Sequence, residues 1–434
     1  MKKTICWLLL FAMLLGGCSN TVSAEREEQP IVNHPILYEP VHDETVTEPP
    51  IPEDSGSANT VPAVEGYESF VNVLSAALIQ GEENKNISPV SVYLALAMAV
   101  EGAQGKTQAE LLALLGEENL ENLRQNAESL MNALLVKGKT GELVLANSIW
   151  LGMQDGNVTF HENYLNTLAE SYGAEAYSVR FGETDAGRRI ASWIQEKTRD
   201  KIRISEDAMT FDMDTLAVLL NTIYLKDGWR TPFDPEKTEQ GIFHGLHGKE
   251  LSVNYMHRTD KGASIVRGEG YLRYALPLKG VGRMVFVLPD EGVSLESVLG
   301  SSEKIDELLH SGKEIVADVN LMVPKFTFQD RTDLEETLIG LGVYLCFTGD
   351  ADFSNMTDTP AHISRVLQES YIGVDENGVE AAAYTMVALD RSAVSMEKRE
   401  KVDFHLIRPF LYTIEAQDGT ILFIGTVTEP DKAQ

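Results

Sequence analysis

The sequence lacks the features on which most hydrolases and nucleic-acid-binding proteins depend. It contains no Gly-x-Ser-x-Gly nucleophile motif and no His-Glu-x-x-His zinc motif. Basic residues are few, since 36 lysines and arginines stand against 66 acidic residues, for a formal net charge of −30. A chain this acidic does not bind nucleic acid by neutralising phosphates. We therefore expect no nucleic-acid partner, and a surface hydrolase is disfavoured.

Cysteine is also scarce, with three residues in the whole chain. Cys6 lies in the N-terminal apolar run, which we expect to be removed as an export signal, and Cys18 directly follows that run and is expected to carry a lipid. Cys346 lies in an apolar segment, and no cysteine is then left to pair with it. The mature domain therefore has no internal disulfide, and its stability must come from burial of a core. We predict that Cys346 is a buried structural thiol and not a nucleophile.

Two weak motifs do not amount to binding sites. His244 and His247 are three residues apart in a glycine-rich turn, but no carboxylate or cysteine stands at ligand spacing. Residues 102–107 faintly resemble a phosphate-binding loop, yet they lack its spacing and follow a predicted helix. The sequence therefore predicts no metal site and no cofactor.

The N-terminus has the pattern of an export signal. Lys2 and Lys3 precede an apolar run of about a dozen residues, which is too short to span a bilayer as a mature helix. The run ends Leu-Gly-Gly before Cys18, which resembles a bacterial lipobox. That resemblance implies cleavage after residue 17 and a lipid on Cys18, which would anchor the chain on the outer face of the bacterial cell membrane or on the cell surface. A plain signal peptide with a chance cysteine is the alternative.

Residues 18–65 are predicted to be a tether. The segment from Ser19 to Glu65 holds seven prolines, ten acidic residues and one arginine, and its apolar residues show no period. Such a segment cannot bury enough surface to offset its conformational entropy. Proline and like charge keep it extended, so we expect it to hold the following domain away from the membrane.

Periodic segments begin near Gly66. Helical signals are a Ser88 cap followed by Pro89, a capping box that starts at Thr107, and an apolar face in residues 188–201. Strands are predicted at residues 143–151, 216–225, 272–278, 284–288, 319–323 and 326–328, with a terminal hairpin of residues 410–414 and 421–427 around Asp418-Gly419. Helices dominate the first third and strands the rest, which is typical of an α+β domain.

Ten short blocks resemble those of serpins and occur in the serpin order. They include Asn-Ile-Ser-Pro-Val-Ser at 86–91 and Asp-Glu-Asn-Gly-Val-Glu-Ala-Ala-Ala at 375–383; the others lie at 102–107, 192–202, 220–226, 229–233, 287–292, 323–326, 351–354 and 408–410. The resemblance covers residues 66–430. It implies one domain with three β-sheets, eight or nine helices and an exposed reactive-centre loop. It also implies a monomeric inhibitor that forms a covalent complex with extracellular serine proteases, and not an enzyme.

The same resemblance identifies a hinge at the start of the reactive-centre loop, which presents a bait residue to the protease and runs to about Ala393. The hinge residues are Gly378, Val379, Glu380, Ala381, Ala382 and Ala383. In a serpin, the cut loop enters the central sheet as a new strand. The sequence fits that task, because one alternate set of side chains is apolar or small: Val379, Ala381, Ala383, Thr385, Val387 and Leu389. The other set carries Glu380, Tyr384 and Asp390, and we expect it to face outward, where charge and bulk are tolerated. No proline interrupts residues 379–401.

Two other interpretations of this segment stay open. It could be an ordinary surface strand, or the loop of a non-inhibitory serpin that acts as a binding or chaperone-like surface protein. A charged or bulky first inserting residue would favour the latter, and Val379 is neither.

The resemblance places the scissile bond fourteen residues after Gly378, between Ser392 and Ala393. A small bait residue suits elastase-like or subtilisin-like proteases, whereas the neighbouring Arg391 would suit trypsin-like ones. The stretch from Gly378 to Pro409 is several residues longer than in familiar relatives. This length leaves Arg391 as the alternative and keeps three further baits open: Met386, Leu389 and Met396.

A polar cluster under the central sheet, called the shutter in this family, is also implied. Ser88, Ser91 and Asn221 match its positions. The histidine that usually stands ten residues before the hinge glycine is replaced by Gln368. An amide can both donate and accept hydrogen bonds, so we expect the cluster to be satisfied in a different way.

Overall fold

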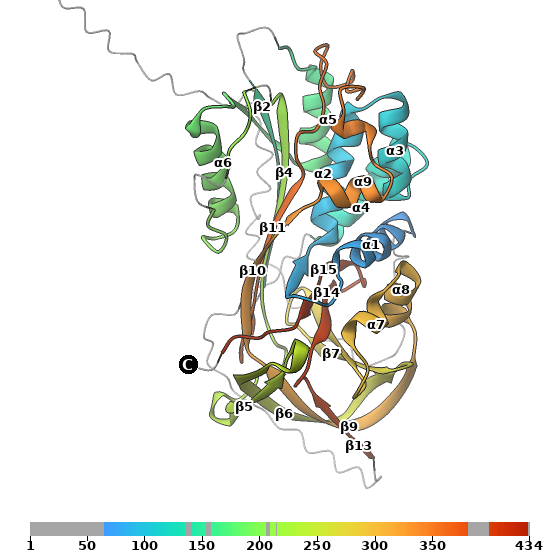
Figure 1. The fold of residues 1–434 in the computed structure, drawn as a ribbon, viewed down its shortest axis with the longest axis vertical. Helices are drawn as coiled ribbons and strands as arrows, with labels where there is room; N and C mark the ends of the chain where they lie inside the picture. Colours follow the sequence, from blue (N-terminus) through green and yellow to red (C-terminus); the bar gives the residue numbers. More distant parts are fainter. Residues whose placement is uncertain are drawn as a thin grey trace, which may run out of the picture.

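The computed structural model describes residues 65–134, 141–152, 158–204, 209–213, 215–380 and 399–432. Within these ranges the chain forms nine α-helices and fifteen strands, which confirms the predicted α+β class (Figure 1). The helices are α1 (Glu65–Leu78), α2 (Pro89–Gly102), α3 (Gly105–Leu115), α4 (Leu120–Leu134), α5 (Glu162–Tyr172), α6 (Thr184–Lys197), α7 (Leu295–Leu299), α8 (Ser302–His310) and α9 (Glu335–Gly340).

The strands fall into two hydrogen-bonded sets. The six-stranded set has the order β10 (Phe326–Asp333), β11 (Leu367–Val374), β12 (Gly378–Val379), β4 (Ala217–Gly228), β2 (Gly141–Gly152) and β3 (Glu175–Val179). The nine-stranded set has the order β1 (Lys85–Ile87), β15 (Ile421–Val427), β14 (Phe410–Ala416), β8 (Gly282–Pro289), β7 (Tyr271–Pro277), β6 (Glu250–Arg267), β9 (Lys313–Pro324) and β13 (Glu400–His405), with β5 (Glu239–His244) also on β6.

The larger set contains two of the three expected sheets in one continuous ladder. Strand β6 pairs with β5 near its start and with β7 at its end, and β9 follows it along most of its length. The register of β6 with β9 shifts between Asp260 and Ala263. Irregularities of this kind bend a strand, so one long strand can serve two differently oriented sheets.

Helix α2 is the apolar centre of the domain. Ser88 caps it by accepting a hydrogen bond from the Ser91 N–H, and Pro89 opens its first turn, as predicted. Every residue of α2 except Ala95 is buried. A helix that is apolar all round is stable only when other elements enclose it. Its side chains join one core cluster that also draws on both strand sets.

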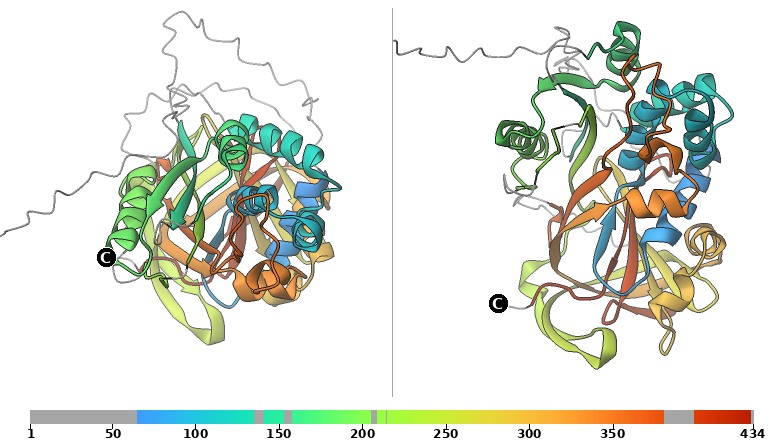
Figure 2. Two further views of the ribbon diagram at one scale, coloured as in Figure 1. Left: turned by 90° about the horizontal axis from the view of Figure 1, so that it is seen from above. Right: turned by 45° about the horizontal axis from the view of Figure 1, so that its top comes forward.

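Helix α6 covers the opposite face of the six-stranded sheet (Figures 1 and 2). Ile190, Trp193 and Ile194 form its apolar face and pack in one cluster with Val218 and Leu220 of β4. The helix ends at Lys197, four residues earlier than predicted, because Arg199 and Asp200 adopt left-handed backbone angles of φ 53° and 62°. The turn that follows the helix therefore lies on the same face of the sheet.

Most of the predicted elements are present, with one clear error. The strands expected around residues 143–151, 216–225 and 284–288 and the terminal hairpin are confirmed. The capping box at Thr107 is wrong, because α3 begins at Gly105 with Gln104 as its N-cap. The hydroxyl of Thr107 instead accepts a hydrogen bond from the backbone of Asp352, 245 residues away. No helix in the described part of the chain is both long enough and apolar enough to cross a membrane.

The Phe326 side chain should be one of the most costly in the core to remove. It is fully buried, and its ring centre lies 6.0 Å from that of Phe410 and 5.9 Å from that of Tyr412. We expect Phe326→Ala to lower the free energy of unfolding by about 3–5 kcal/mol, because the cavity adds to the lost burial. Denaturant unfolding measures this, with Ile339→Ala as the control, since Ile339 is 37% exposed. Equal losses in the two variants would contradict the expectation.

Candidate functional site

The hinge starts as a two-residue strand between β11 and β4. Gly378 pairs with Gly228 and Val379 with Asp227 on one side, and Val379 pairs with Val374 on the other. The Trp229 N–H donates to the Asn377 carbonyl oxygen at 2.8 Å, and the Trp229 indole donates to the Asp375 carbonyl oxygen at 2.8 Å. The two strands that flank the hinge therefore hold its backbone on both sides.

The first two hinge residues suit this position. A Cβ atom on Gly378 would clash with the backbone carbonyl oxygen of Asp227, so only glycine fits there without a shift. Val379 is 3% exposed and belongs to the main core. Its inward direction agrees with the alternation in the sequence.

Several predicted site residues lie outside the described ranges. These are the hinge residues Ala381, Ala382 and Ala383, the bait candidates Met386, Leu389, Arg391, Ser392, Ala393 and Met396, and the lipidation candidate Cys18.

Strand β12 makes the only described strand pairing between β4 and β11. Strand β4 pairs along its other edge with β2, and β11 pairs along its other edge with β10. Between these two strands, the described part of the chain supplies no ladder beyond Gly378–Val379. The facing edges of β4 and β11 thus have no described strand partner along most of their length.

The carboxylate of Glu380 lies under a polar cover. It belongs to the set expected to face outward, but its side chain is only 8% exposed, because Lys201 of the turn after α6 and Tyr224 of β4 lie against it. Its Oε1 accepts a hydrogen bond from the Tyr224 hydroxyl at 2.9 Å and lies 3.3 Å from the Lys201 ammonium. Burial raises the pKa of Glu380, and the contacts with Tyr224 and Lys201 offset this only in part.

The four predicted shutter residues are divided between the two strands. On the β11 side, the Gln368 amide accepts from the Ser88 N–H at 3.2 Å and donates to the Ser88 carbonyl oxygen at 2.8 Å, while Ser88 caps Ser91. On the β4 side, Asn221 donates to the Asn147 side chain at 2.5 Å. Two polar atoms of the set, Asn221 Oδ1 and Ser91 Oγ, are buried without a hydrogen-bond partner. The Gln368 amide therefore has its hydrogen-bond partners in the backbone of Ser88, whereas other polar atoms of the cluster have none.

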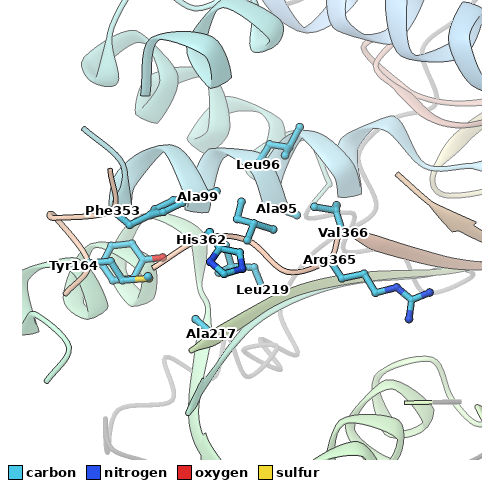
Figure 3. A pocket seen from close by; sticks show the side chains of 12 residues that line it. Ala95, Leu96, Ala99, Tyr164, Ala217, Leu219, Phe353, His362, Arg365 and Val366 are labelled. Carbon is cyan, nitrogen blue, oxygen red and sulfur yellow. The ribbon is translucent and has the colours of Figure 1, made fainter. Parts of the chain in front are cut away.

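A small apolar cavity of about 40 Å³ lies at the far end of the same two strands (Figure 3). Ala217 and Leu219 of β4 lie on one side, and Val366 lies just before β11. Ala95 and Ala99 of α2 line the other wall. The hinge and this cavity thus mark opposite ends of the space between β4 and β11.

Two anchoring groups at the hinge end were not predicted as site residues. The Glu376 carboxylate accepts a hydrogen bond from Thr238 at 2.8 Å and pairs with Lys325 at 2.8 Å. Asp227 is fully buried and accepts from the N–H groups of Gly280 and Val281 at 2.8 and 2.7 Å. Burial raises the pKa of Asp227, and these two N–H groups oppose the shift. Both groups join segments distant in sequence, so no local pattern could reveal the pairings.

The cysteine and the two turn histidines considered from the sequence show no sign of a reactive or metal-binding role. Burial raises the pKa of the Cys346 thiol to about 12, so it stays protonated, and its predicted burial is confirmed. His244 and His247 are exposed, and no group of three or more His, Cys, Asp or Glu side chains in the described ranges could hold a metal ion. The facing edges of β4 and β11 can accept a longer strand in place of the two-residue strand β12.

Comparisons with known proteins agree with this architecture. A family model described as serpin (serine protease inhibitor) matches residues 66–430. An uncharacterized serpin-like protein of Thermococcus kodakarensis is 30% identical over 442 residues, which covers 99% of each chain. The native state of the thermophilic serpin tengpin is similar with a TM-score of 0.75 at 26% identity, covering 89% of this chain and 98% of that one. Human thyroxine-binding globulin, solved with its hormone, gives a TM-score of 0.74 at 26% identity, covering 85% and 100%.

Glu376 should stabilise the folded protein in a pH-dependent way. Burial alone would raise its pKa, but Lys325 and Thr238 lower it below the ordinary value. A carboxylate with a lowered folded pKa adds stability above its unfolded pKa of about 4.3, and the gain is lost as pH falls through the folded pKa. We expect Glu376→Gln to lower the free energy of unfolding at pH 7 by about 1–2 kcal/mol, since the Lys325 side chain is 36% exposed and partly screened.

Denaturant unfolding at pH 7 and at pH 3 measures this effect. The difference between wild type and Glu376→Gln should shrink at the lower pH. A difference that stays constant across that range would show that the carboxylate charge does not matter.

Proposed function

Because this chain belongs to the serpin (serine protease inhibitor) family, we propose that it inhibits extracellular serine proteases as a single-use substrate and is not itself an enzyme. The observation that carries this proposal is the short strand β12. The hinge already lies between β4 and β11, whose facing edges have no other described strand partner. An open strand edge readily accepts an added strand, because the new backbone hydrogen bonds satisfy it.

The proposed chemistry is that of the protease. Its serine oxygen attacks the carbonyl carbon of the bait residue, which we assign to Ser392. The peptide bond to Ala393 breaks, the new amine leaves with the proton supplied by the protease histidine, and an ester joins the protease to Ser392. Insertion of the freed loop before water cleaves that ester would carry the protease across the molecule and trap it.

The register of β12 gives the path of insertion. Val379 stands opposite Asp227 of β4 and Val374 of β11, and both pairings are antiparallel. Continued six residues further, the same register brings Thr385 between Asn221 and Gln368. Thr385 is the one hydroxyl residue among the alternate side chains that start at Val379 and would face the core, which we call the inward set. It would meet the divided shutter where Asn221 Oδ1 lacks a hydrogen-bond partner. A polar group is thus available where the polar cluster is incomplete.

Two residues later the same register reaches the apolar cavity. Val387 would lie between Leu219 and Val366, which both line that cavity. Filling an apolar void gains both burial and contact energy. Three positions of this apolar or small set therefore support the proposed path of insertion: Val379 is apolar at the hinge, Thr385 is polar at the shutter and Val387 is apolar at the far end.

The bait residue sets the target class. Ser392 suits elastase-like or subtilisin-like proteases, and Arg391 is the trypsin-like alternative. Incubation of the protein with a panel of such proteases, followed by mass spectrometry of the released C-terminal fragment, tests the assignment. A fragment that starts at Ala393 supports Ser392, and one that starts at Ser392 supports Arg391.

Val379→Arg should convert the inhibitor into a substrate. The Val379 side chain is 3% exposed, so an arginine there would carry a buried charge into the sheet. We expect the fraction of protease trapped in an SDS-stable complex to fall by about tenfold or more, because insertion slows relative to hydrolysis of the ester. Gel electrophoresis after incubation with an elastase measures it.

Val316→Arg is the matched control for Val379→Arg. Val316 is 62% exposed on β9, so complex formation should stay at the wild-type level. If wild-type protein is cleaved cleanly without a stable complex, the inhibitory proposal fails. The non-inhibitory alternative, a binding or chaperone-like surface protein, then takes its place.

We also propose that a lipid on Cys18 anchors the protein at the cell surface, with residues 19–65 as the tether. Full-length protein expressed in bacteria should partition into the detergent phase of a phase-separation assay, and Cys18→Ala should move it to the aqueous phase. Cys346→Ala is the control and should leave partitioning unchanged, since Cys346 is buried in the domain. A Cys18→Ala variant that still partitions into detergent would falsify the lipid assignment.

A further inference from the structure

The Glu380 carboxylate is more buried than the side chain of an ordinary residue at the start of an exposed loop needs to be. Its side chain is 8% exposed, and its Oε2 is buried without a hydrogen-bond partner. Burying a carboxylate is costly unless it is paired. Two groups contact Oε1 directly, the Tyr224 hydroxyl and the Lys201 ammonium, and Lys226 adds a further nearby positive charge.

Lys201 reaches both strands that flank the hinge. Its ammonium lies 3.3 Å from Glu380 Oε1, which also bonds Tyr224 of β4, and 5.5 Å from the ring centre of Tyr371 on β11. A cation at this distance from an aromatic ring is attracted to its face. Lys201 thus connects the α6 side of the sheet to β4, to β11 and to the hinge between them.

The turn that carries Lys201 is itself fixed. The Lys201 carbonyl oxygen accepts a hydrogen bond from Gln329 of β10 at 2.7 Å. Two residues earlier, Arg199 pairs with Glu142 of β2 at 2.6 Å. Strands on both sides of the hinge therefore hold this turn, so the ammonium is presented at a defined place.

The backbone of Glu380 bends out of the strand. Its N–H still donates to the Gly373 carbonyl oxygen at 2.7 Å, which continues the register of β12 along β11. Its φ of +47° is left-handed, a conformation that costs a non-glycine residue about 1 kcal/mol or more. The side-chain contacts hold the residue where its backbone alone would not stay.

We propose that Lys201, Tyr224 and Glu380 form a latch that keeps the hinge in the sheet, in the register of insertion, before a protease cuts the loop. In a continued strand, Glu380 still points to the α6 side, because Val379 points to the core and side chains alternate. The ion pair can then persist through insertion, while the left-handed kink must straighten. Lys201 and Tyr224 are thus positioning residues for the proposed inhibition, and the inference rests on that function for its consequence.

Hydrogen exchange of the full-length protein, without any protease, tests the latch. Lys201→Met should speed exchange at the amides of Val379 and Glu380 by about tenfold, since a charge-assisted contact no longer opposes hinge opening. Glu380→Gln should have an effect of the same size, and the double variant should add little to either. The double-variant result separates a direct contact from two independent losses of stability.

Lys197→Met is the matched control for Lys201→Met. Lys197 makes a comparable ion pair at 2.7 Å with Glu175 at the C-terminal end of α6, away from the hinge. Hinge exchange should stay at the wild-type rate in this variant. The latch is overturned if Lys201→Met leaves hinge exchange unchanged, or if both lysine variants speed it equally.

Stoichiometry of inhibition separates the latch from the proposed function. If the latch acts as proposed, the Lys201→Met variant should require several-fold more inhibitor per trapped protease molecule, while its loop is cleaved at about the wild-type rate. If exchange responds as expected but wild-type protein traps no protease, the latch stands and the inhibitory function fails. If wild-type protein traps protease and neither exchange nor stoichiometry responds to Lys201→Met, the function stands and the latch fails.

Discussion

Two residues, Gly378 and Val379, make the only described strand pairing between β4 and β11, and the other features of the site follow from this constraint. Elsewhere the sheet is joined by long ladders, such as that between β2 and β4. Because the connection is so short, the polar cluster beneath the sheet is divided, with Gln368 bonded to Ser88 on one side and Asn221 to Asn147 on the other. For the same reason, a cavity remains at the far end of the two strands. A sheet with unsatisfied groups along one internal line gains energy by accepting a strand there.

The rest of the molecule keeps this line in place. Asp227 fastens the end of β4 to the turn between β7 and β8 through two backbone N–H groups, and Lys325 fastens the segment before the hinge through Glu376. The apolar helix α2 lies under the sheet, and α6 covers its other face. The polar atoms between the strands are not all hydrogen-bonded. Unsatisfied groups of this kind persist only where the surrounding structure holds them.

The local sequence predicted many of the helices and strands of the fold. Ser88 with Pro89 predicted the start of α2, since a cap and a first-turn proline act within one helical turn. The apolar runs predicted β2, β4 and the terminal hairpin for the same local reason. Thr107 shows the limit of such reasoning: its pattern fits a capping box, yet its hydroxyl accepts a hydrogen bond from Asp352, and the N-cap of α3 is Gln104, three residues earlier. A local pattern cannot show that a distant backbone group will compete for a side chain.

At the site, the sequence by itself determined the alternation of the hinge and the loss of the usual shutter histidine. Alternation follows from the two-residue period of a strand, so Val379 could be assigned to the core before its neighbours were known. Only the tertiary structure decided that Glu380, on the face expected to be open, lies beneath the turn after α6 and against Lys201 and Tyr224. These three residues come from segments up to 179 residues apart (380 − 201). Their meeting depends on how α6 packs on the sheet, which no local pattern encodes.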